Sequence, residues 1–185
     1  VTGSWPPYYP DHPDNAQPTA HIGKGSPTSV KFGYKSKFPP AYRNALFVLD
    51  WTFGRILAVH LLEHGSGYVG SPEVFLGGRP LNVTDLAFGP DGAMYFVTGG
   101  RRTQSGLYRV CYTGTNGPRS RSTKQQAARA ELSGKARDIR HHLEGNHGKP
   151  NQEADDTFLA DGAAGKLVSL WVHLGSSDPR VRQAA

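Results

Sequence analysis

The chain has 185 residues, of which 23 are glycine and 14 proline, about a fifth of the total and mostly before residue 120. No run approaches the ~18 apolar residues of a membrane helix, which excludes a membrane span in this chain. The single cysteine, Cys111, excludes an internal disulfide framework, a Cys-rich zinc site and c-type haem attachment. The net charge of +6 comes mainly from residues 119–140. This stretch lacks interleaved aromatic residues, so we expect a solvated basic helix and linker, not a nucleic-acid partner.

Residues 1–25 are rich in proline, tyrosine, glycine and aspartate. Four prolines within the first thirteen residues exclude a helix and a central strand. We therefore predict an extended loop at the start of the chain.

Residues 26–78 predict a sheet of four strands. Short apolar or alternating segments are separated by turn residues, and the whole set has the length of one β-propeller blade. The expected strands are 29–33, 45–50, 55–61 and 72–77.

The same cycle restarts over residues 83–114 with strands 83–88, 93–98 and 107–112. Gly89-Pro-Asp-Gly92 joins the first two, since proline fixes φ and Asp-Gly supplies positive φ. Residues 99–106 are expected to form a loop, and Cys111 a buried structural thiol within the last strand. A fourth strand is missing from this second blade.

After a polar linker at 115–126, the pattern changes from alternating to helical over residues 127–185. A first helix is predicted up to Leu143 and ended by Gly145, and a second over 163–174. Asp178 and Pro179 have the types preferred at the N-cap and first position of a third helix. This pattern is typical of HEAT-like repeats, and we expect the chain to be a piece cut from a longer protein.

Residues 38–48 and 83–97 resemble the glucose/sorbosone dehydrogenase-like propellers. Together with 50–54 and 99–109, they resemble more narrowly the large "putative membrane-bound dehydrogenase" proteins of planctomycetes and verrucomicrobia. The resemblance covers residues 3–185 and is specific over 26–112. It implies a mostly β chain with an α-helical C-terminal part: two blades of a six-bladed propeller, then the start of HEAT-like repeats. It also implies a periplasmic or extracellular location and a C-terminal cytochrome c domain carrying haem c.

In such a propeller, the loops at one end of the blades form the ligand-binding rim. The segments expected there are 26–28, 50–52, 84–85 and 98–103. Asp50 and Asp85 are the candidate carboxylates, as general base or as calcium ligands; the alternative is that each caps a turn or bonds neighbouring backbone.

The resemblance also indicates candidate cofactor-binding residues, namely Thr52, Thr84, Arg101 and Arg102. Related soluble sugar dehydrogenases hold pyrroloquinoline quinone with a lysine and arginines. The corresponding positions here carry Thr52, Asn82 and Thr84. These two blades therefore lack the cationic quinone anchors. Arg101 and Arg102 are candidates for binding an anionic group; the alternative is that both are solvated loop arginines.

Two functions follow from these observations. The first is a redox function, in which the propeller oxidises a sugar or related alcohol and passes electrons to the haem domain; quinone and calcium are its candidate cofactors. The second is a non-catalytic propeller and HEAT scaffold that binds carbohydrate or protein. The partners expected in either case are the remaining blades and the haem domain, and we expect this piece to be inactive by itself.

Overall fold

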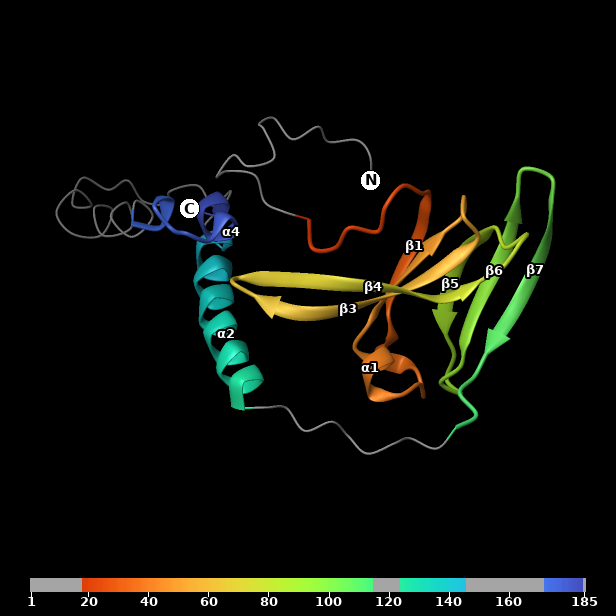
Figure 1. The fold of residues 1–185 in the computed structure, drawn as a ribbon, viewed down its shortest axis with the longest axis horizontal. Coiled ribbons are helices and arrows are strands. Elements are labelled where there is room, and N and C mark those ends of the chain that lie inside the picture. Colours follow the sequence, from red (N-terminus) through yellow and green to blue (C-terminus); the bar gives the residue numbers. More distant parts are fainter. Residues whose placement is uncertain (1–17, 115–123, 146–171, 185) are drawn as a thin grey trace, which may run out of the picture. The chain divides into compact units, whose positions relative to one another are not determined.

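The computed structural model describes residues 18–114, 124–145 and 172–184. The chain divides into a sheet unit, which includes 18–62 and 69–121, and a helical unit, which includes 63–68 and 122–185. Each unit is described by itself. In the described residues the chain is mostly β, with two antiparallel sheets of four and three strands (Figure 1).

The first sheet has the order β1-β2-β3-β4, so that each strand pairs with the next along the chain. A short 3-10 turn (Gly33–Lys35) and the single-turn helix α1 (Pro40–Arg43) connect β1 to β2. The four expected strands are confirmed. Their bounds are β1 Pro27–Phe32, β2 Leu46–Asp50, β3 Arg55–His64 and β4 Gly67–Gly77.

The second sheet has the order β5-β6-β7, with strands Val83–Phe88, Met94–Gly100 and Thr103–Val110. Two expectations for this sheet were wrong. Residues 99–106 do not form a loop, because β6 and β7 continue to a tight turn in which Gly100 pairs with Thr103. Cys111 is exposed instead of buried, because β7 already ends at Val110.

The core of the sheet unit lies between the two sheets and combines aliphatic side chains with a cluster of phenylalanine rings. Phe47, which is fully buried, lies with its ring centroid 5.0 Å from that of Phe75 and 5.7 Å from that of Phe88. Phe38 contacts the same rings. Burial of such rings contributes strongly to the stability of this unit. The buried residues of this core are Phe38, Ala45, Phe47, Leu49, Ile56, Ala58, Val83, Leu86, Met94 and Phe96.

The first hairpin of each sheet repeats the same local structure. The first strand carries a bulge at Thr28 in one sheet and at Thr84 in the other. Backbone hydrogen bonds close both ends of each hairpin at matching places. They run from Gly33 N to Ala45 O (3.1 Å) and Gly89 N to Ala93 O (3.0 Å), and from Trp51 N to Ser26 O (3.0 Å) and Gly99 N to Asn82 O (2.9 Å). The sequence repeat is thus a structural repeat.

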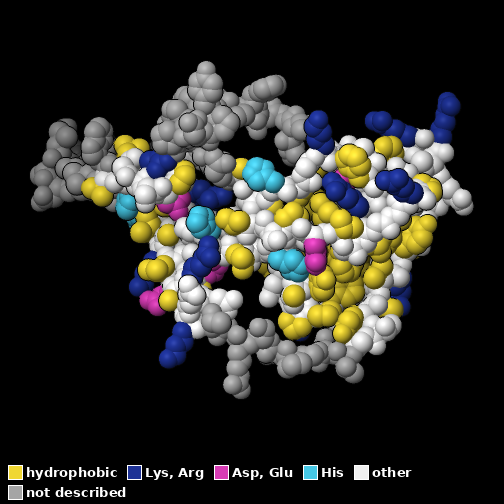
Figure 2. Space-filling view, in the orientation of Figure 1, with side chains coloured by type: hydrophobic (Ala, Val, Ile, Leu, Met, Phe, Trp, Pro, Cys, Tyr) yellow, Lys and Arg dark blue, Asp and Glu magenta, His cyan; other side chains and the backbone are white. Residues whose placement is uncertain are grey.

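The sheet unit leaves apolar side chains on its surface, shown in yellow in Figure 2. Val97 and Leu107 are cross-strand partners that are 37% and 71% exposed. On the first sheet, by contrast, Val48, Leu57 and Val59 are covered by Ala20 and Ile22, from the part of the predicted 1–25 loop that the structure describes.

In the helical unit, α2 (Lys124–Glu144) confirms the first predicted helix, and α4 (Pro179–Ala184) begins after Asp178, whose carboxylate accepts from Arg180 N (2.9 Å). Leu143 packs with Val181 and Ala184. The second predicted helix, 163–174, lies outside the described residues except for 172–174, which are helical, and residues 1–17 and 115–123 lie outside them entirely. The helices within the described segments are too short or too polar to cross a lipid bilayer.

Candidate functional site

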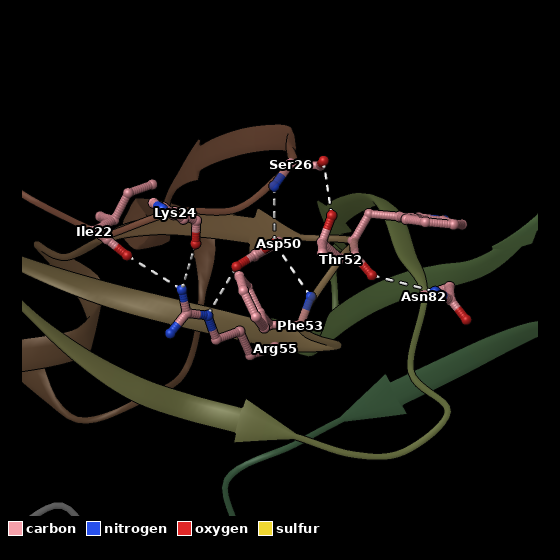
Figure 3. Close-up of polar contacts among 9 residues, drawn as sticks. Ile22, Lys24, Ser26, Asp50, Thr52, Phe53, Arg55 and Asn82 are labelled. Carbon is pink, nitrogen blue, oxygen red and sulfur yellow. Dashed lines mark hydrogen bonds and ion pairs between the residues drawn. The ribbon is translucent and has the colours of Figure 1, made fainter. Parts of the chain in front are cut away.

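The candidate site is the rim of the sheet unit where β1 and β5 begin and β2 and β6 end. In an antiparallel hairpin the start of one strand lies beside the end of its partner, so four segments meet here. The segments expected at the rim are brought together by hydrogen bonds, of which Figure 3 shows those that join Ser26, 50–52 and Asn82. The segments are 26–29, 50–52, 82–85 and 98–102.

Asp50, the first candidate carboxylate, is 2% exposed and fully engaged by the protein itself. Its Oδ1 accepts from the backbone N–H groups of Ser26 (3.0 Å) and Phe53 (3.4 Å), and its Oδ2 accepts from Arg55 Nε (2.9 Å). Figure 3 shows these three donors arranged around the carboxylate. The carboxylate therefore holds the rim together, as the turn-capping alternative describes.

Arg55 extends this network to the chain segment before β1. Its Nη2 donates to the carbonyl oxygens of Ile22 (3.2 Å) and Lys24 (3.4 Å). A Cβ placed on Gly25 would lie 2.5 Å from Asp50 Oδ2, so only glycine allows this close approach. The ion pair thereby fixes the path of residues 22–26 along the rim.

The polar groups of Thr52 and Asn82 are also held in place. Thr52 Oγ1 donates to Ser26 Oγ (2.8 Å), and Asn82 Nδ2 donates to Trp51 O (3.2 Å). The half-buried indole of Trp51 donates from Nε1 to Gly99 O (2.9 Å), which ties β2 to the second sheet. An aromatic ring with a fixed orientation is thus part of the rim.

Asp85, the second candidate carboxylate, is exposed and lies beside β1. Its Oδ1 accepts from Ser29 Oγ (2.6 Å) and from Leu86 N (2.8 Å). These hydrogen bonds, with Lys31 nearby, hold the pKa of the Asp85 carboxyl below its usual value. Asp85 is therefore an ionised hydrogen-bond acceptor at neutral pH, which does not suit a general base poised to take a proton.

Arg101 and Arg102, the candidate anion ligands, form the turn between β6 and β7. The Arg101 guanidinium lies over the Trp51 ring at 5.3 Å from its centroid. Thr84, by contrast, is turned toward the second sheet itself, where its hydroxyl donates to Val97 O (3.2 Å). The rim therefore presents cations at Arg101 and Arg102, whereas the Thr84 hydroxyl is used in a hydrogen bond within the second sheet, at the β5 bulge.

The surroundings of Asp50 do not suit the calcium ion suggested as a cofactor. Calcium takes roughly six to eight oxygen ligands. Asp50 already accepts three hydrogen bonds, and the Arg55 cation lies 2.9 Å from its Oδ2, which opposes a second cation. No group of three or more His, Cys, Asp or Glu side chains able to share a metal ion occurs within the described segments. Pyrroloquinoline quinone carries carboxylates, and the rim residues whose charge and hydrogen-bond donors suit a carboxylate are Arg101 and Arg102.

Comparisons with protein families, with curated proteins and with solved structures find no match to this chain.

Sequence reasoning missed the partners that fix the two carboxylates. Arg55 is directly opposite Asp50 in the β2–β3 register. Because opposite charges at such positions pair favourably, this ion pair was predictable from the hairpin alone. Ser29 gave no such signal, because it meets Asp85 only through the packing of β1 beside β5.

A second polar cluster, absent from the sequence-based candidates, lies on β3, β4 and α1. His60 Nε2 lies 2.8 Å from Glu73 Oε1, and Tyr42 is hydrogen-bonded to the same carboxylate. The bonds from His60 and Tyr42 lower the pKa of Glu73, and the bond to Glu73, with burial, raises the pKa of Tyr42. The cluster connects α1 to the first sheet.

The third cluster joins Asp91, Tyr95 and Arg109 on the second sheet. Arg109 Nη2 and Tyr95 Oη donate to Asp91 Oδ2 (2.8 and 2.9 Å), and Ala93 N donates to Oδ1 (3.1 Å). The Arg109 bond above all, followed by those from Ala93 and Tyr95, lowers the pKa of Asp91 from 3.8 to about 2.

This shift predicts a loss of stability in acid. Because the folded-state pKa of Asp91 is depressed, the ionised carboxylate stabilises the fold above pH 3.8, and this contribution disappears as the pH falls toward about 2. We expect Asp91→Asn to flatten the dependence of Tm on pH between about pH 4 and pH 2, measured by circular dichroism. An unchanged slope in the variant would show that Asp91 contributes nothing to acid sensitivity.

Proposed function

We propose that the sheet unit is a recognition module whose rim binds carbohydrate, the second of the two functions derived from the sequence. The observation that carries the proposal is the division of the rim residues into those that hold the rim together and those that remain at its surface. The buried carboxylate that a catalytic centre would need, Asp50, is engaged in holding the rim. The groups left at the surface are hydroxyls, an exposed carboxylate, a fixed half-buried indole and the two arginines of the β6–β7 turn.

This set of groups matches the chemistry of a sugar. Sugar hydroxyls both donate and accept hydrogen bonds, as the hydroxyls of Ser26 and Thr52 do, and Asp85 accepts them strongly. The apolar face of a pyranose ring stacks on an aromatic ring, which Trp51 offers in a fixed orientation. Groups that are already ordered lose little conformational entropy on binding.

The architecture proposed with this function is a β-propeller of which the two sheets are consecutive blades, followed by HEAT-like repeats in a secreted protein. The repeated bulge and hairpin closures of β1–β2 and β5–β6 support equivalent blades. The exposed pair Val97 and Leu107 supports further packing against the second sheet. Remaining blades of a longer chain would complete the rim.

Isothermal titration calorimetry of the chain with tetrasaccharides of glucose, mannose, xylose, galactose and galacturonic acid tests the proposal. We expect binding of at least one, weakened about tenfold or more by Trp51→Ala because the stacking surface is lost. Leu107→Ala, an exposed apolar residue away from the rim, is the control and should bind as the unchanged chain does. The proposal fails if no tetrasaccharide binds at millimolar concentration, or if the control loses binding equally.

The redox function rests on the sequence resemblance alone and concerns a longer protein that carries haem c. Its test is dye reduction by the whole protein with a sugar, with and without pyrroloquinoline quinone and calcium. A complete gene without a Cys-x-x-Cys-His motif downstream of this chain would contradict it.

A further inference from the structure

The turn between β6 and β7 has an unexpected composition. Its two central residues, Arg101 and Arg102, have φ values of 48° and 69°, both in the left-handed region. A two-residue hairpin turn with positive φ at both positions favours Asn-Gly, because larger side chains are strained there. Folding alone would therefore not select two arginines at this turn.

Neither guanidinium has a carboxylate partner among the residues that the structure describes. In the same unit Arg55 is paired with Asp50 and Arg109 with Asp91, whereas Arg43 and Arg79, like the two turn arginines, have no carboxylate partner in the part of the chain that the structure describes. The Arg101 guanidinium lies over the Trp51 ring, and both arginines are exposed. The two charges at the turn are thus available to a ligand, whereas those of Arg55 and Arg109 are neutralised.

The position of the turn connects it to the rim. Trp51 is held by Gly99, which lies just before the turn, and is covered on one side by Arg101. A sugar lying against Trp51 and Thr52 would therefore place its substituents within reach of the guanidinium groups. A guanidinium binds a carboxylate through two parallel hydrogen bonds and a neutral hydroxyl less strongly.

We propose that the Arg101–Arg102 turn selects acidic sugars, by binding the carboxylate of a uronic acid held at the rim. This inference rests on the proposed carbohydrate binding and adds the class of ligand. It also explains the strained turn, because the two arginines are retained for binding at a cost in stability.

The test compares tetragalacturonate with its methyl ester, which has the same sugar ring but no charge. Calorimetry with the unchanged chain should give an affinity for the acid at least about tenfold above that for the ester, since each charge-assisted bond adds strongly to binding. Equal affinities would overturn the selection of acidic sugars while leaving the carbohydrate site intact. Binding of neither would overturn both proposals.

Two double variants separate the charge from the turn. Arg101→Asn with Arg102→Gly supplies the favoured turn residues, so Tm should rise by roughly 4 °C or more while the preference for the acid disappears. Arg101→Gln with Arg102→Gln removes the charge but keeps the strain, so the preference should disappear without a rise in Tm. A preference for the acid that persists in the Gln variant would overturn the proposal.

Discussion

Replacing Phe47 with alanine is expected to destabilise the sheet unit by about 3–5 kcal/mol, the largest effect of any single substitution considered for this chain. The side chain is fully buried and contacts the rings of Phe38, Phe75 and Phe88. Phe88 belongs to the second sheet, so the cavity left by the substitution would open at the boundary between the two sheets. The measurement is the free energy of unfolding of the chain from urea titrations followed by circular dichroism.

Phe32→Ala is the matched control, because it removes the same atoms from the same sheet. Phe32 is 41% exposed and stacks on Tyr34, at 4.9 Å between ring centroids. Its loss should cost about 1–2 kcal/mol, since the ring is already partly exposed to water. Equal costs for the two variants would contradict a core centred on Phe47.

The strands were predictable because their signal is local. Residues 46–49 form a continuous apolar run in a strand that is buried on both faces, and 83–88 place Val83 and Leu86 in the core, so each strand is recognisable from its own residues. The β6–β7 turn was not predictable in the same way. Arg101 and Arg102 are residues that turn chemistry disfavours, so the sequence suggested a long loop where the chain makes a two-residue turn.

The first predicted helix illustrates a different limit. Periodicity correctly indicated α2 and its end near Gly145, since spacing alone determines that pattern. The periodicity did not identify which face of α2 is buried. Leu132 and Ile139 are 69% and 41% exposed, whereas Ser133 is 4% exposed. Which side of a helix is buried depends on the elements packed against it, and this information is not local in sequence.

The rim shows the same division between residue type and role. The sequence identified Asp50 and Asp85 as the carboxylates of the rim, and the structure brings both there. Their chemistry depends on neighbours, and three donors to Asp50 change a candidate base into a structural group. A residue type can be read from one position, but its free lone pairs depend on the whole fold.

Asp50→Asn is expected to have the second largest effect, a loss of about 2–4 kcal/mol in the free energy of unfolding. An amide has one acceptor oxygen in place of two. Its NH₂ group would face either Arg55 or the backbone N–H groups of Ser26 and Phe53, and those donors would lose their partner. Arg55, which is 26% exposed, can turn partly toward water, so the loss stays below that of a fully buried pair.

Asp85→Asn is the control for removing a charge from the rim, and it should cost less than about 1 kcal/mol because this carboxylate is exposed. A double-mutant cycle that combines Asp50→Asn with Arg55→Gln then isolates the Asp50–Arg55 ion pair, with an expected coupling energy of about 1–3 kcal/mol. An additive result would mean that the two side chains stabilise the fold independently.

The Asp50→Asn variant also tests whether the Asp50–Arg55 ion pair affects carbohydrate binding. Asp50 holds Ser26 and Phe53, on either side of Thr52, so it acts on the rim as a positioning residue. If the rim binds carbohydrate, Asp50→Asn should weaken acidic and methyl-esterified tetragalacturonate by the same factor, because it displaces the whole surface. The Gln variant of Arg101 and Arg102 should instead weaken only the acid. Selective loss of the acid in Asp50→Asn would show that this carboxylate acts through the charged turn, not through the position of the rim.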